Sequence, residues 1–283
     1  MAWTLTHDVA GYLATAAPFL RSRAAEHSVL LTVSETVRRG GPAAFGDDPP
    51  LFGWYSAGDG PVTAACLHTP PHPVALTPMP DAVAAALAAV LAVRGQPVAG
   101  VDGRPGPAHA FAAEWQRQTG QPARLGRRER LYRLGELVPP APAPPGWARA
   151  AARADLELLL AWLAAFQQEA DSDGGPVRPH GVDDRISYGG FTLWETGDGP
   201  VSLAGRTRAV AGQARVGPVY TPPEHRGRGY GGAVTVAVSQ QALAAGVSEV
   251  LLYTDLANPT SNALYQRLGY QPVTDSVQLR FTP

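Results

Sequence analysis

The sequence lacks lysine and carries almost no net charge. Its 23 basic residues, all arginine, are balanced by 24 acidic residues, for a formal net charge of −1 over 283 residues. A balance this close to zero offers no chain-wide attraction to nucleic acid or to an anionic membrane. The absence of lysine also excludes a Walker-type phosphate loop, which requires that side chain. We therefore expect no nucleic-acid partner and no nucleoside-triphosphate loop.

Cysteine is almost as scarce. The single Cys66 excludes an internal disulfide and a thiolate metal site. Its neighbours Ala64, Ala65 and Leu67 are apolar, which favours a buried core residue over a reactive nucleophile. We expect no metal.

Long hydrophobic runs are also missing. The longest unbroken apolar stretch, residues 82–93, is too short to span a bilayer. The first residues, MAWTLTHD, lack the basic start of a secretory signal peptide. With 45% hydrophobic and 17% charged residues, the composition is that of a globular protein, and the length suits two domains of about 150 residues. We expect a soluble, cytoplasmic chain.

A proline-rich segment near the midpoint organises the chain. Residues 138–146 read VPPAPAPPG, which favours an extended, semi-rigid connector. The sequence therefore predicts a first domain over residues 1–137, a linker over 138–146 and a second domain over 147–283.

The two halves resemble each other at three places in the same order. FGWYSAGDGPV at 52–62 resembles FTLWETGDGPV at 191–201, LHTPP at 67–71 resembles VYTPP at 219–223, and WQRQTG at 115–120 resembles YQRLG at 265–269. On this alignment the second half carries an insertion at about residues 206–217. Three ordered matches predict an internal duplication.

Hydrophobic periodicity predicts a mixed α/β domain in the second half. We expect strands at 147–151, 191–195, 201–204, 215–220, 249–255 and 277–281, with helices at 155–170, 229–245 and 259–268. This order predicts a mixed sheet with one parallel crossover through the helix at 229–245.

The densest motif is VYTPPEHRGRGYG, residues 219–231, which predicts a strand, a tight loop and a helix start. Glycines at 227, 229 and 231 allow close approach of the backbone to a ligand. Free N–H groups at the helix N-terminus suit a pyrophosphate, and Arg226 and Arg228 add charged donors.

Two other interpretations of this loop remain open. It is also compatible with a glycine-rich surface turn whose arginines are solvated. A dinucleotide fingerprint is a second alternative, because Gly227, Gly229 and Gly232 satisfy G-x-G-x-x-G, although that motif should follow the first strand directly.

A second block strengthens the phosphate interpretation. Residues 258–270 read NPTSNALYQRLGY, in which Asn258 is a suitable N-cap and Pro259 a suitable first helical residue. Asn258, Asn262 and Tyr265 then share one helix face. Together the two blocks resemble the GNAT superfamily of N-acetyltransferases, with Arg226 and two of the glycines on the defining loop positions. The whole chain is similar to a bacterial subgroup with a degenerate N-terminal GNAT-like domain.

The resemblance implies an α/β fold of two tandem GNAT-like domains and an acetyl-CoA-dependent enzyme. Such an enzyme transfers an acetyl group directly to a primary amine, here of an unidentified small molecule or peptide. A non-catalytic acyl-CoA sensor or partner-binding module is the alternative. The oligomeric state is left open.

The resemblance also assigns roles to residues. The backbone of the strand end pairs with the pantetheine arm, the loop holds the pyrophosphate, two asparagines contact the far arm, and one tyrosine protonates the leaving thiolate. In that order, these residues are Val219, Tyr220 and Thr221; Arg226, Gly227, Arg228, Gly229, Tyr230 and Gly231; Asn258 and Asn262; and Tyr265.

The general base is left open among Glu224, Glu195 and Asp255. The first half departs from the cofactor pattern, because prolines at 73, 78 and 80 remove N–H donors and Trp115 stands where the second half has Tyr265. We expect only the second half to bind acetyl-CoA.

Overall fold

The computed structural model describes residues 2–58, 60–170 and 176–282. These fold into two compact units. Unit 1 consists of Met1–Leu131, Asp255–Ala257 and Thr274–Pro283, and unit 2 of Tyr132–Thr254 and Asn258–Val273.

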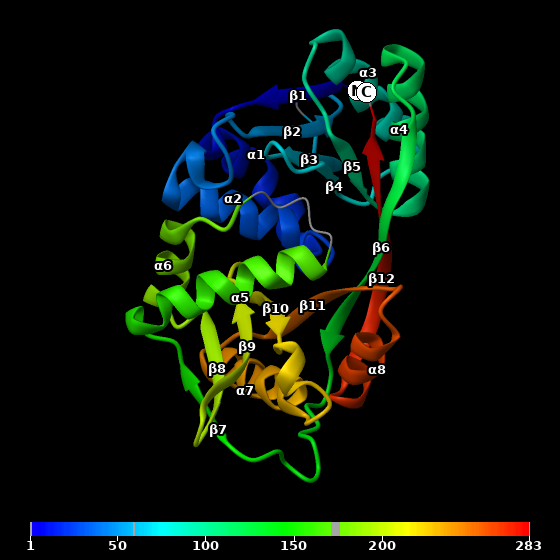
Figure 1. The fold of residues 1–283 in the computed structure, drawn as a ribbon. Coiled ribbons are helices and arrows are strands. Elements are labelled where there is room, and N and C mark those ends of the chain that lie inside the picture. Colours follow the sequence, from blue (N-terminus) through cyan, green and yellow to red (C-terminus); the bar gives the residue numbers. More distant parts are fainter. Residues whose placement is uncertain (1, 59, 171–175, 283) are drawn as a thin grey trace. The chain divides into compact units, whose positions relative to one another are not determined.

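Unit 1 is a mixed sheet with two pairs of helices (Figure 1). Its elements are β1 (Ala2–Thr6), α1 (Val9–Ser22), α2 (Ser28–Gly40), β2 (Leu51–Ser56), β3 (Ala64–His68), β4 (Val74–Leu76), α3 (Asp81–Val93), β5 (Gly100–Gly103), α4 (Pro105–Thr119) and most of β6 (Ala123–Leu134). Neighbouring strands from β1 to β4 are antiparallel, whereas β4 and β5 are parallel. The parallel pair is joined by α3, as a crossover requires.

The core of unit 1 lies between its sheet and the helices α3 and α4. Leu87, Phe111 and Trp115 are buried there together with Cys66. Cys66 is 3% exposed, so the prediction that it is a buried core residue is confirmed, and burial raises the pKa of its thiol.

Unit 2 repeats this order of elements. They are β7 (Trp147–Ala150), α5 (Leu156–Glu169), α6 (Pro179–Ser187), β8 (Phe191–Thr196), β9 (Gly199–Arg206), β10 (Gln213–Tyr220), α7 (Tyr230–Ala244), β11 (Glu249–Asp255), α8 (Pro259–Arg267) and the start of β12 (Tyr270–Phe281). β7 to β10 are antiparallel neighbours, and β10 and β11 are parallel. The mixed sheet with a crossover through α7 is therefore confirmed, while the short α6 was not predicted.

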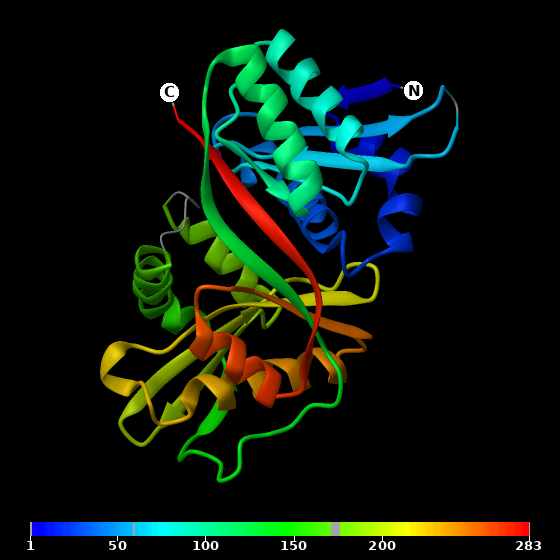
Figure 2. The same cartoon turned by 90° about the vertical axis from the view of Figure 1, so that its right-hand side faces the viewer.

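Two long strands, β6 and β12, each have residues in both units (Figure 2). In unit 1, β12 lies between β5 and β6, and residues 277–280 pair antiparallel with β5. In unit 2, the end of β6 lies beside β11. The last strand of the chain thus completes the sheet of unit 1.

One part of the predicted repeat is wrong. Residues 67–71 span the end of β3 and the turn after it. Residues 219–223 span the end of β10, which is the counterpart of β4 and not of β3. The short β4 connects to α3 through residues 77–80, and this segment is the true counterpart of the glycine loop. The two segments have similar sequences because a Thr-Pro-Pro turn can end either strand, and this similarity made the sequence alignment wrong here.

The proline-rich segment 138–146 is anchored to unit 2. The Val138 N–H donates to the Leu268 carbonyl at 3.0 Å, and the Trp194 indole Nε1 donates to the Pro145 carbonyl at 3.0 Å. Across the described part of the chain, every helix is too short or too polar to cross a membrane.

Candidate cofactor-binding site

The pairing of β10 with β11 stops before the residues that are predicted to bind the cofactor. The parallel pairing joins residues 213–216 to residues 249–252 and does not reach Val219 or Tyr220. On the other side, the register with β9 shifts between Val216 and Val219, which marks a β-bulge. The backbone N–H and C=O groups at the end of β10 are therefore not paired with β11. An extended ligand can hydrogen-bond to them.

The loop after β10 leads to an uncapped helix start. Gly227 and Gly229 have φ angles of +75° and +83°, which only glycine adopts without strain. Gly229 is the N-cap of α7 and has no side chain to accept from the first N–H groups of the helix. These donors, together with the positive end of the helix dipole, form a site suited to an anion.

Two further glycines at this helix have different roles. A Cβ on Gly231 would lie 3.4 Å from the Thr221 hydroxyl oxygen, so the loop and helix approach closely here. A Cβ on Gly232 would lie 3.2 Å from Leu264 Cδ1, so this glycine serves the packing of α7 on α8. The dinucleotide alternative is wrong, because the loop follows the fourth strand of unit 2 and not the first.

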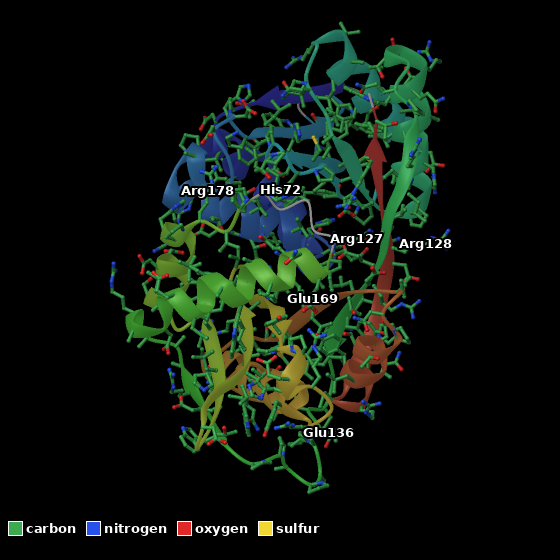
Figure 3. All side chains as sticks on the ribbon, in the orientation of Figure 1. His72, Arg127, Arg128, Glu136, Glu169 and Arg178 are labelled. Carbon is green, nitrogen blue, oxygen red and sulfur yellow. The ribbon has the colours of Figure 1, made fainter. Side chains whose placement is uncertain are left out.

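Arg226 is held by other residues of unit 2. Its Nε donates to the Thr221 carbonyl at 2.9 Å, and its Nη2 lies 2.6 Å from Glu169 Oε2. Glu169 is the last residue of α5 (Figure 3). The Tyr220 hydroxyl donates to the other Glu169 oxygen at 3.2 Å. The side chains of Arg226 and Glu169 are 47% and 45% exposed, so solvent and ligands can reach the pair. Arg228 is exposed and Tyr230 is buried, which leaves only the backbone of Tyr230 for a phosphate.

The two predicted asparagines stabilise the start of α8. Asn258 caps the helix by accepting from the Ser261 N–H at 3.0 Å, as predicted. Asn262 Nδ2 donates to the Asn258 carbonyl at 2.8 Å, and its Oδ1 accepts from the Tyr132 hydroxyl at 3.0 Å. Tyr132, on β6, is a residue that sequence reasoning missed, because no motif surrounds it.

Tyr265 lies on α8 in the same core cluster as the bulged strand. It is 8% exposed, and the cluster includes Val216, with Val219 packed against it. Its ring meets the Tyr270 ring edge-on, with centroids 6.0 Å apart. Burial raises the pKa of Tyr265 to about 12, so its hydroxyl keeps its proton at neutral pH and is available as a proton donor.

Comparisons with known proteins agree with this arrangement. Residues 199–279 match the family described as FR47-like protein. A GCN5-related N-acetyltransferase from Sphaerobacter thermophilus covers 99% of this chain and 95% of its own, at 19% identity and a TM-score of 0.59. A tandem GNAT protein from the clavulanic acid biosynthesis pathway covers 99% and 98%, at 15% identity and a TM-score of 0.55. The chain has the tandem GNAT fold.

An acetyltransferase from Colwellia psychrerythraea shares this fold over the full length of both chains, with 11% identity and a TM-score of 0.59. A search of curated protein sequences gives no match. The expected fold of two tandem GNAT-like domains is thereby confirmed.

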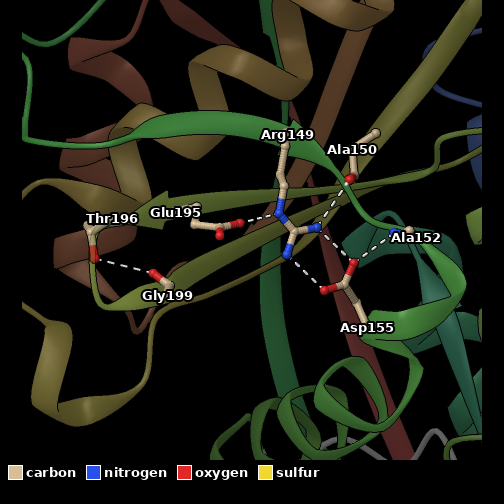
Figure 4. Close-up of polar contacts among 7 residues, drawn as sticks. All are labelled: Arg149, Ala150, Ala152, Asp155, Glu195, Thr196 and Gly199. Carbon is tan, nitrogen blue, oxygen red and sulfur yellow. Dashed lines mark hydrogen bonds and ion pairs between the residues drawn. The ribbon is translucent and has the colours of Figure 1, made fainter.

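Within this GNAT fold, the three candidate bases have different surroundings. Glu195 forms an ion pair with Arg149, which also makes two 2.8 Å contacts with Asp155 (Figure 4). Asp255 accepts from the Ala257 N–H at 2.8 Å and so closes a turn. Glu224 is exposed in the short helical turn Pro223–His225. Glu195 is thus committed to joining β8 to the edge strand β7, which argues against a catalytic role.

Unit 1 has a different helix start at the corresponding point of the GNAT fold. α3 begins at Asp81 after Pro80, and Asp81 places a carboxylate in the first turn. That carboxylate interacts favourably with the helix dipole and would repel a phosphate. Pro78 and Pro80 add no N–H donors to this connection.

Proposed function

We propose that the chain is an acetyl-CoA-dependent N-acetyltransferase that acts on a primary amine of a small molecule or peptide. One observation carries this proposal: the strand with interrupted pairing, β10, leads directly into a glycine loop and an uncapped helix. An extended arm with a pyrophosphate at its end has a chemistry that suits both features.

The binding roles follow the order of the chain. The backbone of Val219, Tyr220 and Thr221 pairs with the pantetheine arm, and the N–H groups from Gly227 to Gly231 receive the pyrophosphate. The exposed Arg228 adds a charged donor beside this loop. Asn258 and Asn262 hold the start of α8 in place, and their exposed edges lie toward the far arm in this proposal.

Acetyl-CoA supplies a thioester carbonyl and a thiolate leaving group. The Val219 N–H, at the bulge, donates to the oxyanion that forms when the amine attacks that carbonyl. Tyr265 donates its proton to the departing sulfur, and the nitrogen loses a proton to water, which restores the phenol. The products are an amide and free CoA, so atoms and protons balance without an enzyme-bound intermediate.

The first experiment titrates the full chain with acetyl-CoA by calorimetry and then supplies a panel of primary amines while free thiol is measured. We expect one binding site per chain and amine-dependent thiol release. Two equivalent sites would show that unit 1 also binds the cofactor. Binding with no turnover on any amine would favour the acyl-CoA sensor.

A further inference from the structure

Three arginines surround Tyr188 in unit 2. Arg185 lies in α6, Arg206 ends β9, and Arg208 follows in the connection to β10; we call them the arginine cluster. The guanidinium carbons of Arg206 and Arg208 lie 5.7 Å and 4.0 Å from the centre of the Tyr188 ring. The guanidinium of Arg185 lies 4.4 Å from the centre of the Phe191 ring.

Each arginine uses only some of its donors. Arg185 Nη2 donates to the Gly217 carbonyl at 2.7 Å, and Arg206 Nη2 donates to the Tyr188 carbonyl at 3.2 Å. Arg208 Nη2 donates to Asp184 Oδ1 at 2.7 Å. The Nε atoms of all three arginines are buried and have no acceptor among the described residues.

The charge of the arginine cluster is not balanced by its neighbours. Its three guanidiniums face one contacting carboxylate, that of Asp184, since Asp183 forms an ion pair with Arg153 at 3.4 Å. Buried donors without acceptors and unpaired buried charges are both costly. An arrangement of this kind is completed by an anion, and the planar fork of arginine suits a carboxylate or a phosphate.

The arginine cluster lies beside the proposed site of acetyl transfer. Gly217, whose carbonyl accepts from Arg185, lies within the bulge between Val216 and Val219, and Arg206 is in register with Val216. The pyrophosphate loop begins after Tyr220, at the other end of β10. Since a strand rises about 3.4 Å per residue, Val216, the register partner of Arg206, lies roughly 14 Å from Tyr220. The cluster is therefore placed for a second substrate and not for the cofactor phosphates.

We propose that the arginine cluster binds an oxyanion on the acceptor, so that the substrate is an amine that also carries a carboxylate or a phosphate. This inference rests on the proposed function. Asp184 forms an ion pair with Arg208. The Asp184 side chain is 53% exposed, so it can move aside when an oxyanion binds. Arg208 is itself 27% exposed, which gives the oxyanion access from solvent.

The binding experiment uses inorganic phosphate and acetate as probes, with the full chain saturated by acetyl-CoA, and measures their dissociation constants by calorimetry. We expect Arg208→Gln to weaken probe binding by about 10-fold, the loss of one charge-assisted contact. Asp184→Asn should strengthen it several-fold, because it removes the competing carboxylate. Arg94→Gln, an exposed arginine of unit 1, is the matched control and should change nothing.

Several outcomes overturn the inference. These are failure of both probes to bind, probe binding that Arg208→Gln and Asp184→Asn leave unchanged, and displacement of the probe by acetyl-CoA. Asp184→Asn is expected to strengthen probe binding, and a folding defect would weaken it, so misfolding cannot produce the expected result.

Turnover separates this inference from the proposed function. Glycine and phosphoethanolamine should have a KM at least 10-fold below those of glycinamide and ethanolamine, respectively. Equal turnover of the neutral amines would overturn the anionic acceptor and leave the acetyltransferase intact. No acetyl-CoA binding would overturn the acetyltransferase, and titration of the probes alone would still decide the cluster.

Discussion

Units 1 and 2 share an order of elements and differ at the point where a phosphate would bind. In unit 2, β10 has eight residues and leads to α7 through residues 221–229, whereas β4 has three residues and leads to α3 through residues 77–80. The helix that follows begins after Gly229 in unit 2 and at Asp81 in unit 1. The proposed anion site therefore depends on one connection and not on the fold that the two units share.

A second difference lies in the next helix. Trp115 on α4 and Tyr265 on α8 hold matching positions, and both are buried, at 3% and 8% exposure. The Trp115 indole donates to Gln121 at 3.0 Å and belongs to the core of unit 1. Only unit 2 has a phenol at this position, so only unit 2 has a group there that can act as a general acid.

The largest expected effect comes from the glycine loop. Gly229→Val should weaken acetyl-CoA binding by at least about 100-fold, because valine resists the φ of +83° and its side chain, which would contact Pro144, crowds the loop proposed to hold the pyrophosphate. Calorimetric titration measures this loss. Gly95→Val tests the strain alone, since Gly95 follows α3 with a φ of +62° and open space around it.

We expect Gly95→Val to lower stability and leave cofactor affinity unchanged. A folded Gly229→Val chain that binds acetyl-CoA normally would show that the cofactor lies elsewhere. Equal losses in both variants would attribute the effect to backbone strain.

The next effect compares the two aromatic positions. Tyr265→Phe should lower kcat by roughly 10-fold or more with little change in acetyl-CoA affinity, because only the proton donor is lost. Trp115→Phe removes the indole donor of unit 1 and should leave kcat unchanged. If Tyr265→Phe turns over as fast as the parent chain, Tyr265 serves only in packing.

The two units also differ in the strand before the last helix. In unit 1 this strand, β5, carries a carboxyl group, whereas the middle of its counterpart in unit 2, β11, is apolar. Burial, reinforced by Glu129, raises the pKa of Asp102 on β5 to about 7, while β11 has Leu251 and Leu252 in its middle. Because this pKa lies above the unfolded value, Asp102 favours the folded state below about pH 4 and loses that contribution as the pH rises through 7.

Asp102→Asn should therefore raise the free energy of unfolding by about 1–2 kcal/mol at pH 8, where the half-buried carboxylate is charged. The gain should shrink as the pH falls and vanish near pH 4. Urea unfolding at several pH values measures it, and Asp48→Asn, an exposed carboxyl of the same unit outside its helices and strands, is the control. A gain that does not depend on pH would exclude the titration of Asp102 as its cause.

Much of this architecture could be predicted from the sequence. The periodicities located the strands β7 to β11, the last residues of β12 and the helices α5, α7 and α8, and the asparagine-proline pair marked the start of α8. The α6 helix was missed because its nine residues, rich in charge, show little apolar periodicity. The course of β6 and β12 could not be read, because the sequence of a strand does not specify which unit supplies its neighbours.

The candidate site was predictable only where it depends on local backbone. Glycines at positive φ and an N-cap asparagine are local features, and the structure has both. The contacts of Tyr132 with Asn262 and of Glu169 with Arg226 join residues 130 and 57 positions apart. No sequence motif encodes such distant pairs, so they emerge only from the packed fold.

The smallest expected effect concerns the Glu169 contact, which has no counterpart in the connection 77–80 of unit 1. Glu169→Gln should strengthen acetyl-CoA binding by about 2- to 3-fold at low salt, because the neutral amide competes less with a phosphate for Arg226. The effect is small because the pair is nearly half exposed, and such pairs contribute about 0.2–1 kcal/mol. Raising the ionic strength should reduce it further. Glu157→Gln, at an exposed position of the same helix, is the control and should have no effect. Weaker binding in Glu169→Gln would show instead that this carboxylate holds Arg226 in its binding position.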